Sequence, residues 1–203
     1  MHLFVSYNFV CNDSVVPVRE NETFTWKNIN VQQGQYITDQ FIFDNQIKNS
    51  KFVLSNARVD KSTLEVSVNS GGTISKFTLS TDVSTIQSSS KVFYTQENEE
   101  GFIEIYFGDG VLGQGLVDGD TISATYISVD IAHVENAKLF SLIDPINGFS
   151  NATITTTTAS RGGAEKEDIE SIKFKATKFY TSQNRLVTLN DYKAKVSEYY
   201  PNA

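Results

Sequence analysis

The stretch that decides the fold is IEIYFGDGVLGQGLVDGDTISATY, which runs from Ile103 to Tyr126. Apolar side chains alternate at 103, 105 and 107, and they alternate again at 122, 124 and 126. A period of two places such side chains on one face of a β-strand. The middle, from Gly108 to Asp120, holds five glycines and three aspartates in thirteen residues. The stretch therefore predicts two strands joined by a long loop.

This loop has two ligand-binding interpretations. A phosphate cradle needs glycines between a strand and the N-terminus of a helix. Here a strand follows, no lysine lies in the loop, and its aspartates would repel a phosphate. A calcium site would take its oxygen ligands from Asp109, Asp118 and Asp120. Because their spacing matches neither a helix-loop-helix site nor the nonapeptide calcium repeat, this site is the less favoured interpretation.

The favoured interpretation of the loop is structural. Glycine adopts backbone angles that cost other residues free energy. We expect Gly108-Asp109-Gly110 to turn off the first strand and Asp118-Gly119-Asp120 to turn back into the second. The predicted turn motif consists of Gly108, Asp109, Gly110, Gly113, Gly115 and Gly119. No ligand is required in this interpretation.

The first 160 residues continue the strand pattern. TLEVSV alternates through Leu64, Val66 and Val68, and turn-rich breaks such as VNSGGT separate the strands. The predicted fold class is mainly β with a small α part (α+β): an antiparallel β-sandwich or barrel-like region followed by two short C-terminal helices. We expect the β-rich region to span 1–160, with a division near 35–50 as an alternative.

Residues 161–203 lose the alternation, and apolar side chains step by three and four instead. This spacing predicts two helices, at about 165–178 and 189–199. Thr188 and Asp191 have the spacing of a capping box at the start of the second helix. Apolar residues of the helices are candidate interface residues: Ile169, Ile172, Phe174, Phe179, Tyr192, Val196 and Tyr199.

Charge and composition exclude several functions. Residues 1–160 carry nine basic and eighteen acidic side chains, whereas residues 161–203 carry eight and six. The acidic balance opposes non-specific nucleic-acid binding, and no apolar run approaches the ~20 residues that cross a membrane. One cysteine and two histidines, with no ligand spacing around them, argue against zinc. Without a nucleophile–base pair, we expect no enzyme, no catalytic residue, no cofactor and no small-molecule substrate.

Two blocks of the sequence resemble the phage baseplate J-like family. In the first, a strand runs into FGDG, then a G-x-x-x-x-G stretch, then a strand that ends in tyrosine. In the second, RGGAEKEDIESIKFKATKFYTSQNRLVTLNDYKAKV, a glycine pair and an acidic run open a helix that ends before N-R-x-V-T-x-x-D-Y. The matching positions of the second block are Gly162, Gly163, Glu170, Ser171, Asn184, Arg185, Val187, Thr188, Asp191 and Tyr192. The resemblance covers roughly 50 to 200.

The resemblance is closest to the baseplate wedge branch of the family, from T-even contractile-tailed bacteriophages. It implies a structural role in the virion: a ring of contacts with copies of itself and with other wedge and hub proteins, which rearranges to trigger sheath contraction. It also implies assembly in the host cytoplasm, with no catalysis and no cofactor. The segment 127–160 departs from the family pattern, so its strand register stays open. The stop directly after a helix predicts a fragment of a longer protein.

A receptor- or glycan-binding β-sandwich of a phage tail is the alternative function, because exposed aromatic side chains on strands also suit a sugar. Aromatic residues make up 12% of the chain but are spread along the strands. They therefore single out no sugar platform, and the structural role is the favoured prediction.

Overall fold

The computed structural model describes residues 7–11, 14–47, 50–129, 134–162, 168–182 and 186–199. The chain divides into two compact units, Met1–Arg161 and Gly162–Ala203, which are described separately here. Three of the matching positions of the second sequence block, Gly163, Asn184 and Arg185, lie outside the described residues. The side chains of Phe179 and Tyr199 are not described either.

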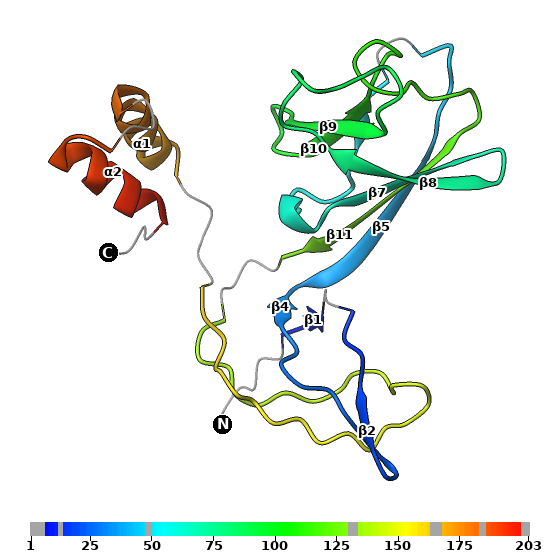
Figure 1. Cartoon of the computed structure of the whole chain (residues 1–203), viewed down its shortest axis with the longest axis vertical. Coiled ribbons are helices and arrows are strands. Elements are labelled where there is room, and N and C mark those ends of the chain that lie inside the picture. The colour runs from blue at the N-terminus through cyan, green and yellow to red at the C-terminus, as the bar shows by residue number, and fades with distance from the viewer. Residues whose placement is uncertain are drawn as a thin grey trace. The chain divides into compact units, whose positions relative to one another are not determined.

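The first unit consists of strands, and the second consists of two helices (Figure 1). The strands are β1 Phe9–Cys11, β2 Val18–Glu20, β3 Thr23–Thr25, β4 Val31–Gln33, β5 Gln35–Ile42, β6 Phe52–Val53, β7 Glu65–Ser70, β8 Thr73–Leu79, β9 Val92–Glu97, β10 Ile103–Phe107 and β11 Thr121–Ser128. A short 3-10 helix, η1, spans Lys61–Thr63, and the α-helices are α1 Ile169–Ser182 and α2 Leu189–Tyr199. The predicted fold class, mainly β with two C-terminal helices, is confirmed.

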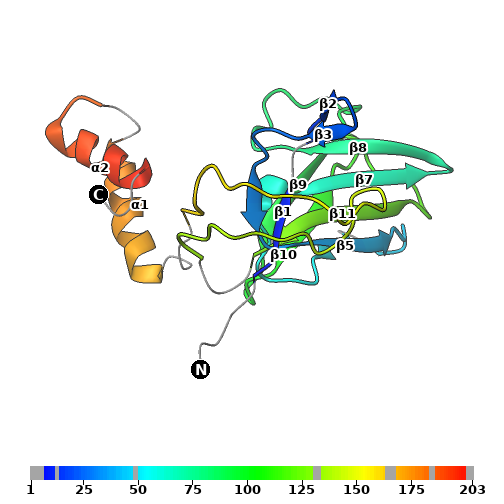
Figure 2. The same ribbon diagram turned by 90° about the horizontal axis from the view of Figure 1, so that it is seen from below.

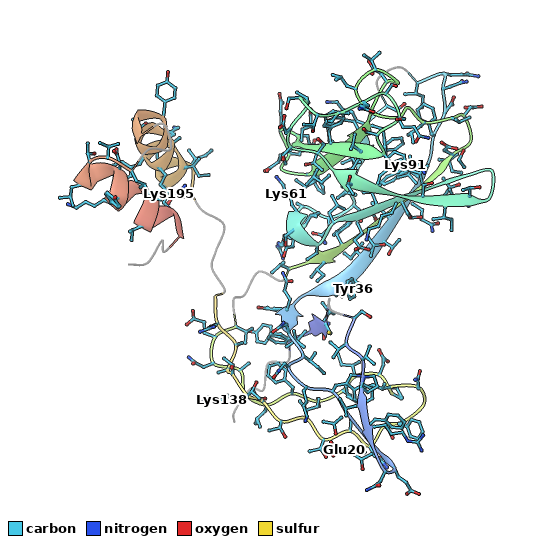
Figure 3. The ribbon with its side chains drawn as sticks, viewed as in Figure 1. Glu20, Tyr36, Lys61, Lys91, Lys138 and Lys195 are labelled. Carbon is cyan, nitrogen blue, oxygen red and sulfur yellow. The ribbon has the colours of Figure 1, made fainter. Side chains whose placement is uncertain are left out.

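Seven strands form one nearly closed, barrel-like sheet in the order β5-β11-β7-β8-β9-β10-β6. Every pair is antiparallel except β8–β9, which is parallel. Parallel neighbours need a long crossover because the chain must return to the starting end of the sheet. Residues 80–91 make this return, and Lys91 at its end donates to Ser75 Oγ of β8 at 2.8 Å (Figure 3). The sequence pattern did not anticipate this one parallel pair.

The two edge strands of the sheet, β5 and β6, meet through side chains. The rings of Phe41 and Phe52 lie 5.4 Å apart between centroids. The Ser55 N–H, just after β6, donates to Asp39 Oδ2 of β5 at 2.8 Å. These contacts close the barrel where the backbone ladder ends, and we call them the seam.

The core of the barrel follows the predicted alternation. Val66 and Val68 of β7 are buried, as are Ile103 and Ile105 of β10. Strand β11 lies between β5 and β7 (Figure 2). Its inward side chains, Ile122, Ala124 and Tyr126, are all fully buried. The period-two reading of these three strands is therefore confirmed.

The remainder of the first unit is a thin layer around the start of β5. It contains the β1–β4 pair, the β2–β3 hairpin and residues 134–162, in which the structure has no strand or helix. The ring of Phe9 packs edge-on against that of Phe140 at 5.1 Å. Asn136 N–H donates to Ser160 O at 2.9 Å, so the two arms of 134–162 run beside each other.

The barrel and the flanking layer of the first unit differ in how many of their residues are buried. Every residue that is buried, among those whose side chains are described, lies between Gly34 and Ser128. The layer of β1 to β4 and 134–162 therefore has little core of its own.

The second unit is the helical pair. Asp168 is the N-cap of α1, because its Oδ1 accepts from the amides of Glu170 and Ser171 at 2.9 Å each. At α2, Asp191 Oδ2 accepts from Thr188 N–H at 2.8 Å and Thr188 Oγ1 accepts from Asp191 N–H at 3.3 Å. This reciprocal pair confirms the predicted capping box. Helix α1 ends at Ser182, beyond the predicted 178.

None of the helices that the structure describes is both long and apolar enough to cross a lipid bilayer.

Candidate functional site

The glycine-rich loop connects two strands that are not neighbours. Strand β10 lies between β9 and β6, whereas β11 lies between β5 and β7. The loop from Gly108 to Asp120 therefore runs across an end of the barrel instead of closing a hairpin. Sequence reasoning found both strands and the loop, but the alternation of side chains carries no signal for which strands pair.

Asp109 shapes the first turn of the loop. Its Oδ1 accepts from Val111 N–H at 2.9 Å and from Leu112 N–H at 3.1 Å. These two backbone hydrogen bonds, that from Leu112 first, hold the pKa of the Asp109 carboxyl below its ordinary value. The side chain thus acts as a local turn-former in the manner of an Asx turn.

Two glycines are required where the loop folds against itself. A Cβ on Gly108 would lie 2.5 Å from Gly113 C and would also collide with Leu112 O. A Cβ on Gly113 would lie 2.7 Å from Val92 Cγ2, and the φ angle of Gly113 is +91°. Gly115 differs, because its φ is not positive and the nearest atom to a Cβ there is 3.5 Å away. The loop therefore depends sterically on Gly108 and Gly113.

The loop is anchored on both sides of its crossing. Gln114 N–H donates to Ser90 O at 2.8 Å, next to the start of β9. The Tyr94 hydroxyl donates to Leu112 O at 3.2 Å, and the Tyr94 ring stacks on that of Tyr106 at 5.3 Å. These contacts hold the first half of the loop over β9 and β10.

The other two aspartates tie the second half to the end of β5. Asp118 Oδ1 accepts from Asn45 N–H at 3.0 Å, and Gly119 N–H donates to Phe43 O at 3.0 Å. Asp120 is 5% exposed, and its Oδ2 accepts from Val117 N–H at 2.8 Å. The carboxylates of Asp109, Asp118 and Asp120 thus each bond a different part of the backbone.

The ion-binding interpretation can be compared with this geometry. Calcium takes about six to eight oxygen ligands at one point. Within the described part of the chain, no three His, Cys, Asp or Glu side chains gather in a way that could hold a metal ion. The hydrogen bonds of the three aspartates give each carboxylate a role in the loop that needs no ion.

A hollow of about 280 Å³ lies beside the loop and is lined by Phe43, Lys51, Tyr106 and Leu116, among others. The Lys51 side chain of this hollow forms an ion pair, because its Nζ lies 3.0 Å from Glu104 Oε2. The hollow therefore combines apolar side chains with a lysine that is already paired.

Glu97 and Glu104 lie on the two strands of a hairpin. Strands β9 and β10 pair, and Asn98 N–H donates to Phe102 O at 2.9 Å to close the turn between them. Glu97 lies 3.9 Å from the amine of Lys61, and Glu104 accepts from Gln96 Nε2 at 2.9 Å. Both glutamates are thus paired, and Glu104, with 14% of its side chain exposed, is largely shielded from solvent.

The helical pair exposes most of its candidate interface residues. Ile169 is 67% exposed and Phe174 is 63% exposed. Ile172, Tyr192 and Val196 are each close to half exposed. Further exposed apolar side chains of this unit were not among the sequence candidates: Tyr180, Leu186, Val187 and Leu189. Leu186 and Val187 lie before the start of α2 and therefore outside the helical stripes from which the interface candidates were chosen.

A family model described as "Bacteriophage baseplate wedge protein gp6, third domain" matches residues 35–138, just over half of the chain. The chain belongs to this gp6 family. A relative, the baseplate wedge protein gp6 of Enterobacteria phage T4, is 26% identical over 214 residues. That alignment covers 95% of the chain and 32% of the relative, so the chain spans about a third of the relative's length.

The gp6 match coincides with the part of the chain that has a core. It starts at Gln35, the first residue of β5, and contains all seven strands of the barrel and the glycine-rich loop. The predicted resemblance to a phage baseplate family is thus confirmed, and its first block lies inside the gp6 domain. The second block lies beyond 138, but an alignment over 95% of the chain must include most of it.

Within that second block, several of the described matching positions have local structural features. Gly162 has a φ of +87°, Glu170 pairs with Lys173 at 2.9 Å, and Thr188 and Asp191 cap α2. Each of these features fixes local backbone geometry. A functional role for the block in the gp6 family remains a prediction.

Proposed function

We propose that the chain is a structural segment of a phage baseplate wedge protein, which acts by holding neighbouring proteins of a contractile tail in place. It joins copies of itself and other wedge and hub proteins into a ring, and it takes part in the rearrangement that releases sheath contraction. The proposal includes no catalysis, no cofactor, no small-molecule substrate, no nucleic acid and no membrane. Its location is the tail baseplate of the virion, after assembly in the host cytoplasm.

The observation that carries this proposal is the distribution of burial. All described buried residues lie between Gly34 and Ser128, within or beside the barrel. The flanking layer nevertheless exposes large apolar side chains, among them Val16 at 82%, Leu139 at 97% and Phe149 at 75%. Ordered backbone without a core is weakly stable alone, since apolar burial must offset the entropy of ordering. Assembly with other proteins supplies the missing burial.

The helical pair also exposes apolar side chains that assembly would bury. Both helices are capped, yet Ile169, Phe174 and Val196 each stay at least half exposed. Exposed apolar side chains that are grouped on one element mark interaction surfaces. We assign this pair and its flanks to contact between copies of the chain, because symmetric pairing of like surfaces is the common form of self-association.

Charge is compatible with that assignment. Residues 161–203 carry eight basic and six acidic side chains, whereas residues 1–160 carry nine and eighteen. The helical segment is therefore close to neutral and pays no large repulsion when two copies meet, unlike the acidic body. Contacts of moderate strength also suit a ring that must rearrange.

Light scattering of the 203-residue chain over a range of concentrations tests the proposal. We expect the mean mass to rise with concentration and the rise to weaken when Ile169 and Phe174 are both replaced by serine. Ile74 on β8 is 72% exposed and serves as the matched control, since Ile74→Ser removes a similar apolar side chain from the barrel surface. Circular dichroism of each variant verifies that the helices remain.

A strict monomer at every concentration would refute self-association through the helical pair. Equal weakening by Ile74→Ser would show that the effect is general surface hydrophobicity and would equally count against the assignment. Binding of the chain to a glycan array, with no self-association, would favour the alternative receptor- or glycan-binding function.

A further inference from the structure

The turn at 146–149 carries the one Asn-Gly pair of the sequence, Asn147-Gly148. Ile146 and Phe149 exchange backbone hydrogen bonds of 3.1 and 2.9 Å, so only two residues form the turn. Both have positive φ, 49° for Asn147 and 84° for Gly148. This is the conformation of a type I′ turn, for which Asn-Gly is the preferred sequence.

The reacting groups of this pair are accessible. Asn147 and Gly148 are both exposed, and a Cβ on Gly148 would meet no atom within 4 Å. In the part of the chain that the structure describes, neither the Asn147 side-chain amide nor the Gly148 N–H has a hydrogen-bond partner. The glycine amide nitrogen is therefore unshielded, and the neighbouring side-chain carbonyl is not held away from it.

We infer that Asn147-Gly148 is a site of spontaneous deamidation through a cyclic imide. The Gly148 amide nitrogen loses its proton to solvent base and attacks Asn147 Cγ, forming a carbon–nitrogen bond. The Cγ–Nδ2 bond then breaks and ammonia leaves with a proton from water, which yields a five-membered succinimide. Water opens either carbonyl of this ring to give aspartate or isoaspartate, so the net reaction exchanges an amide for a carboxylate without any redox change.

The two products have different structural consequences. Aspartate at 147 keeps the same backbone and tolerates the left-handed conformation of the turn. Isoaspartate places an extra methylene in the main chain, so a two-residue turn no longer aligns Ile146 with Phe149. Either product adds a negative charge beside Phe149, which is 75% exposed. The reaction thus changes both the shape and the charge of this tip.

Two other asparagines serve as internal references. Asn151-Ala152 lies in the same segment and is also exposed, but its alanine methyl hinders attack by the following amide. Asn69-Ser70 lies at the end of β7, where Asn69 Oδ1 already accepts from Gly72 N–H at 3.0 Å. We expect Asn147 to react several-fold faster than either of them.

The experiment incubates the full chain at mildly alkaline pH and 37 °C and follows peptide masses over time. The expected result is a mass gain confined first to the peptide of Asn147, with both aspartate and isoaspartate among the products and ammonia released in equal amount. Labelling by an isoaspartyl methyltransferase identifies the isoaspartate. Gly148→Ala should slow the reaction several-fold, and Asn147→Gln should abolish it at this position.

Equal rates at Asn147 and Asn151 would overturn the inference. Aspartate formed without isoaspartate would also overturn it, because direct hydrolysis of the side chain gives that result. Gly148→Ala disturbs a residue of positive φ, so the Asn147→Gln variant, which keeps the turn sequence at 148, provides the independent comparison. A reaction of undiminished rate in Gly148→Ala would exclude the glycine-dependent route.

Discussion

Removing Asp39 should open the seam of the barrel. The carboxylate of Asp39 on β5 accepts three hydrogen bonds across or beside the seam. Ser55 N–H donates to Oδ2 at 2.8 Å, Ser55 Oγ donates to Oδ1 at 2.7 Å, and the Tyr126 hydroxyl donates to Oδ2 at 2.9 Å. Because β5 and β6 are the end strands of the sheet, these side-chain contacts stand where a backbone ladder would close a complete barrel.

The magnitude follows from the surroundings of each donor. Ser55 is exposed, so solvent competes for its two hydrogen bonds and each contributes about 0.5 kcal/mol. Tyr126 is fully buried, and without Asp39 its hydroxyl would keep the longer contact with Ser55 Oγ at 3.3 Å and the neighbouring backbone of Asn56. Leaving such a hydroxyl poorly satisfied costs about 1.5 kcal/mol. Asp39→Ala should therefore lower the free energy of unfolding by about 2 to 3 kcal/mol.

Urea unfolding of the full chain, followed by circular dichroism of the sheet, measures this loss. Gln40→Ala is the matched control, since Gln40 is an exposed neighbour on the same strand. Tyr126→Phe alone should cost about 1 kcal/mol, because it removes the hydrogen bond to Asp39 and the longer contact with Ser55 Oγ but leaves Asp39 its two hydrogen bonds from Ser55. In the Asp39→Ala background, Tyr126→Phe should cost clearly less, since the partner is already gone. A loss from Asp39→Ala no larger than that from Gln40→Ala would refute the role of the seam.

Two further predictions concern the loop and the buried tyrosine. Gly113→Ala should destabilise the barrel by at least about 1 to 2 kcal/mol, because the φ of Gly113 is positive and the added Cβ would collide with Val92. Gly115→Ala should be close to neutral. Urea unfolding midpoints of the two variants test this, and equal losses would contradict the steric argument. Burial first, and then the neighbouring Asp39, raise the pKa of Tyr126 above its ordinary value of 10.0. Stability from this group is thus fully present below about pH 10 and is lost as pH rises above it, because the unfolded chain then ionises a tyrosine that the folded chain keeps protonated. Tyr126→Phe should flatten this alkaline loss, and an unchanged slope would contradict the assignment.

The alternation of apolar side chains was enough to predict the strands but not their partners. Ile105 and Ile122 were placed correctly on inward faces, because a period of two depends only on the strand itself. Pairing depends on contacts between distant segments, which a single sequence does not encode locally. For this reason the separation of β10 from β11, and the parallel pair β8–β9, emerged only from the structure.

The role of Asp39 is a second feature that could not be predicted from the sequence. It occupies an inward position of β5 between Ile37 and Phe41, where a charged residue has no evident use. Its purpose depends on Ser55 and Tyr126, which lie 16 and 87 positions away. A polar network of this kind can be recognised only when all its members are seen together.

The glycine-rich loop and the apolar surfaces of the flanks have different roles: the loop contributes to the stability of the barrel, and the surfaces are proposed to mediate association. The loop crosses the barrel end, and its glycines and aspartates satisfy the backbone of that crossing, so substitutions there should lower the stability of the barrel without altering association. The flanks and the helical pair have the opposite properties, since they contribute little to the core and expose Leu139, Phe149 and Ile169. Substitutions in them should leave the barrel's urea midpoint unchanged while they alter the mass seen by light scattering. A sequence motif that marks the family therefore need not coincide with the surface through which the protein assembles. The motif maintains the backbone conformation of the loop, whereas the proposed surface consists of apolar residues that the fold leaves exposed.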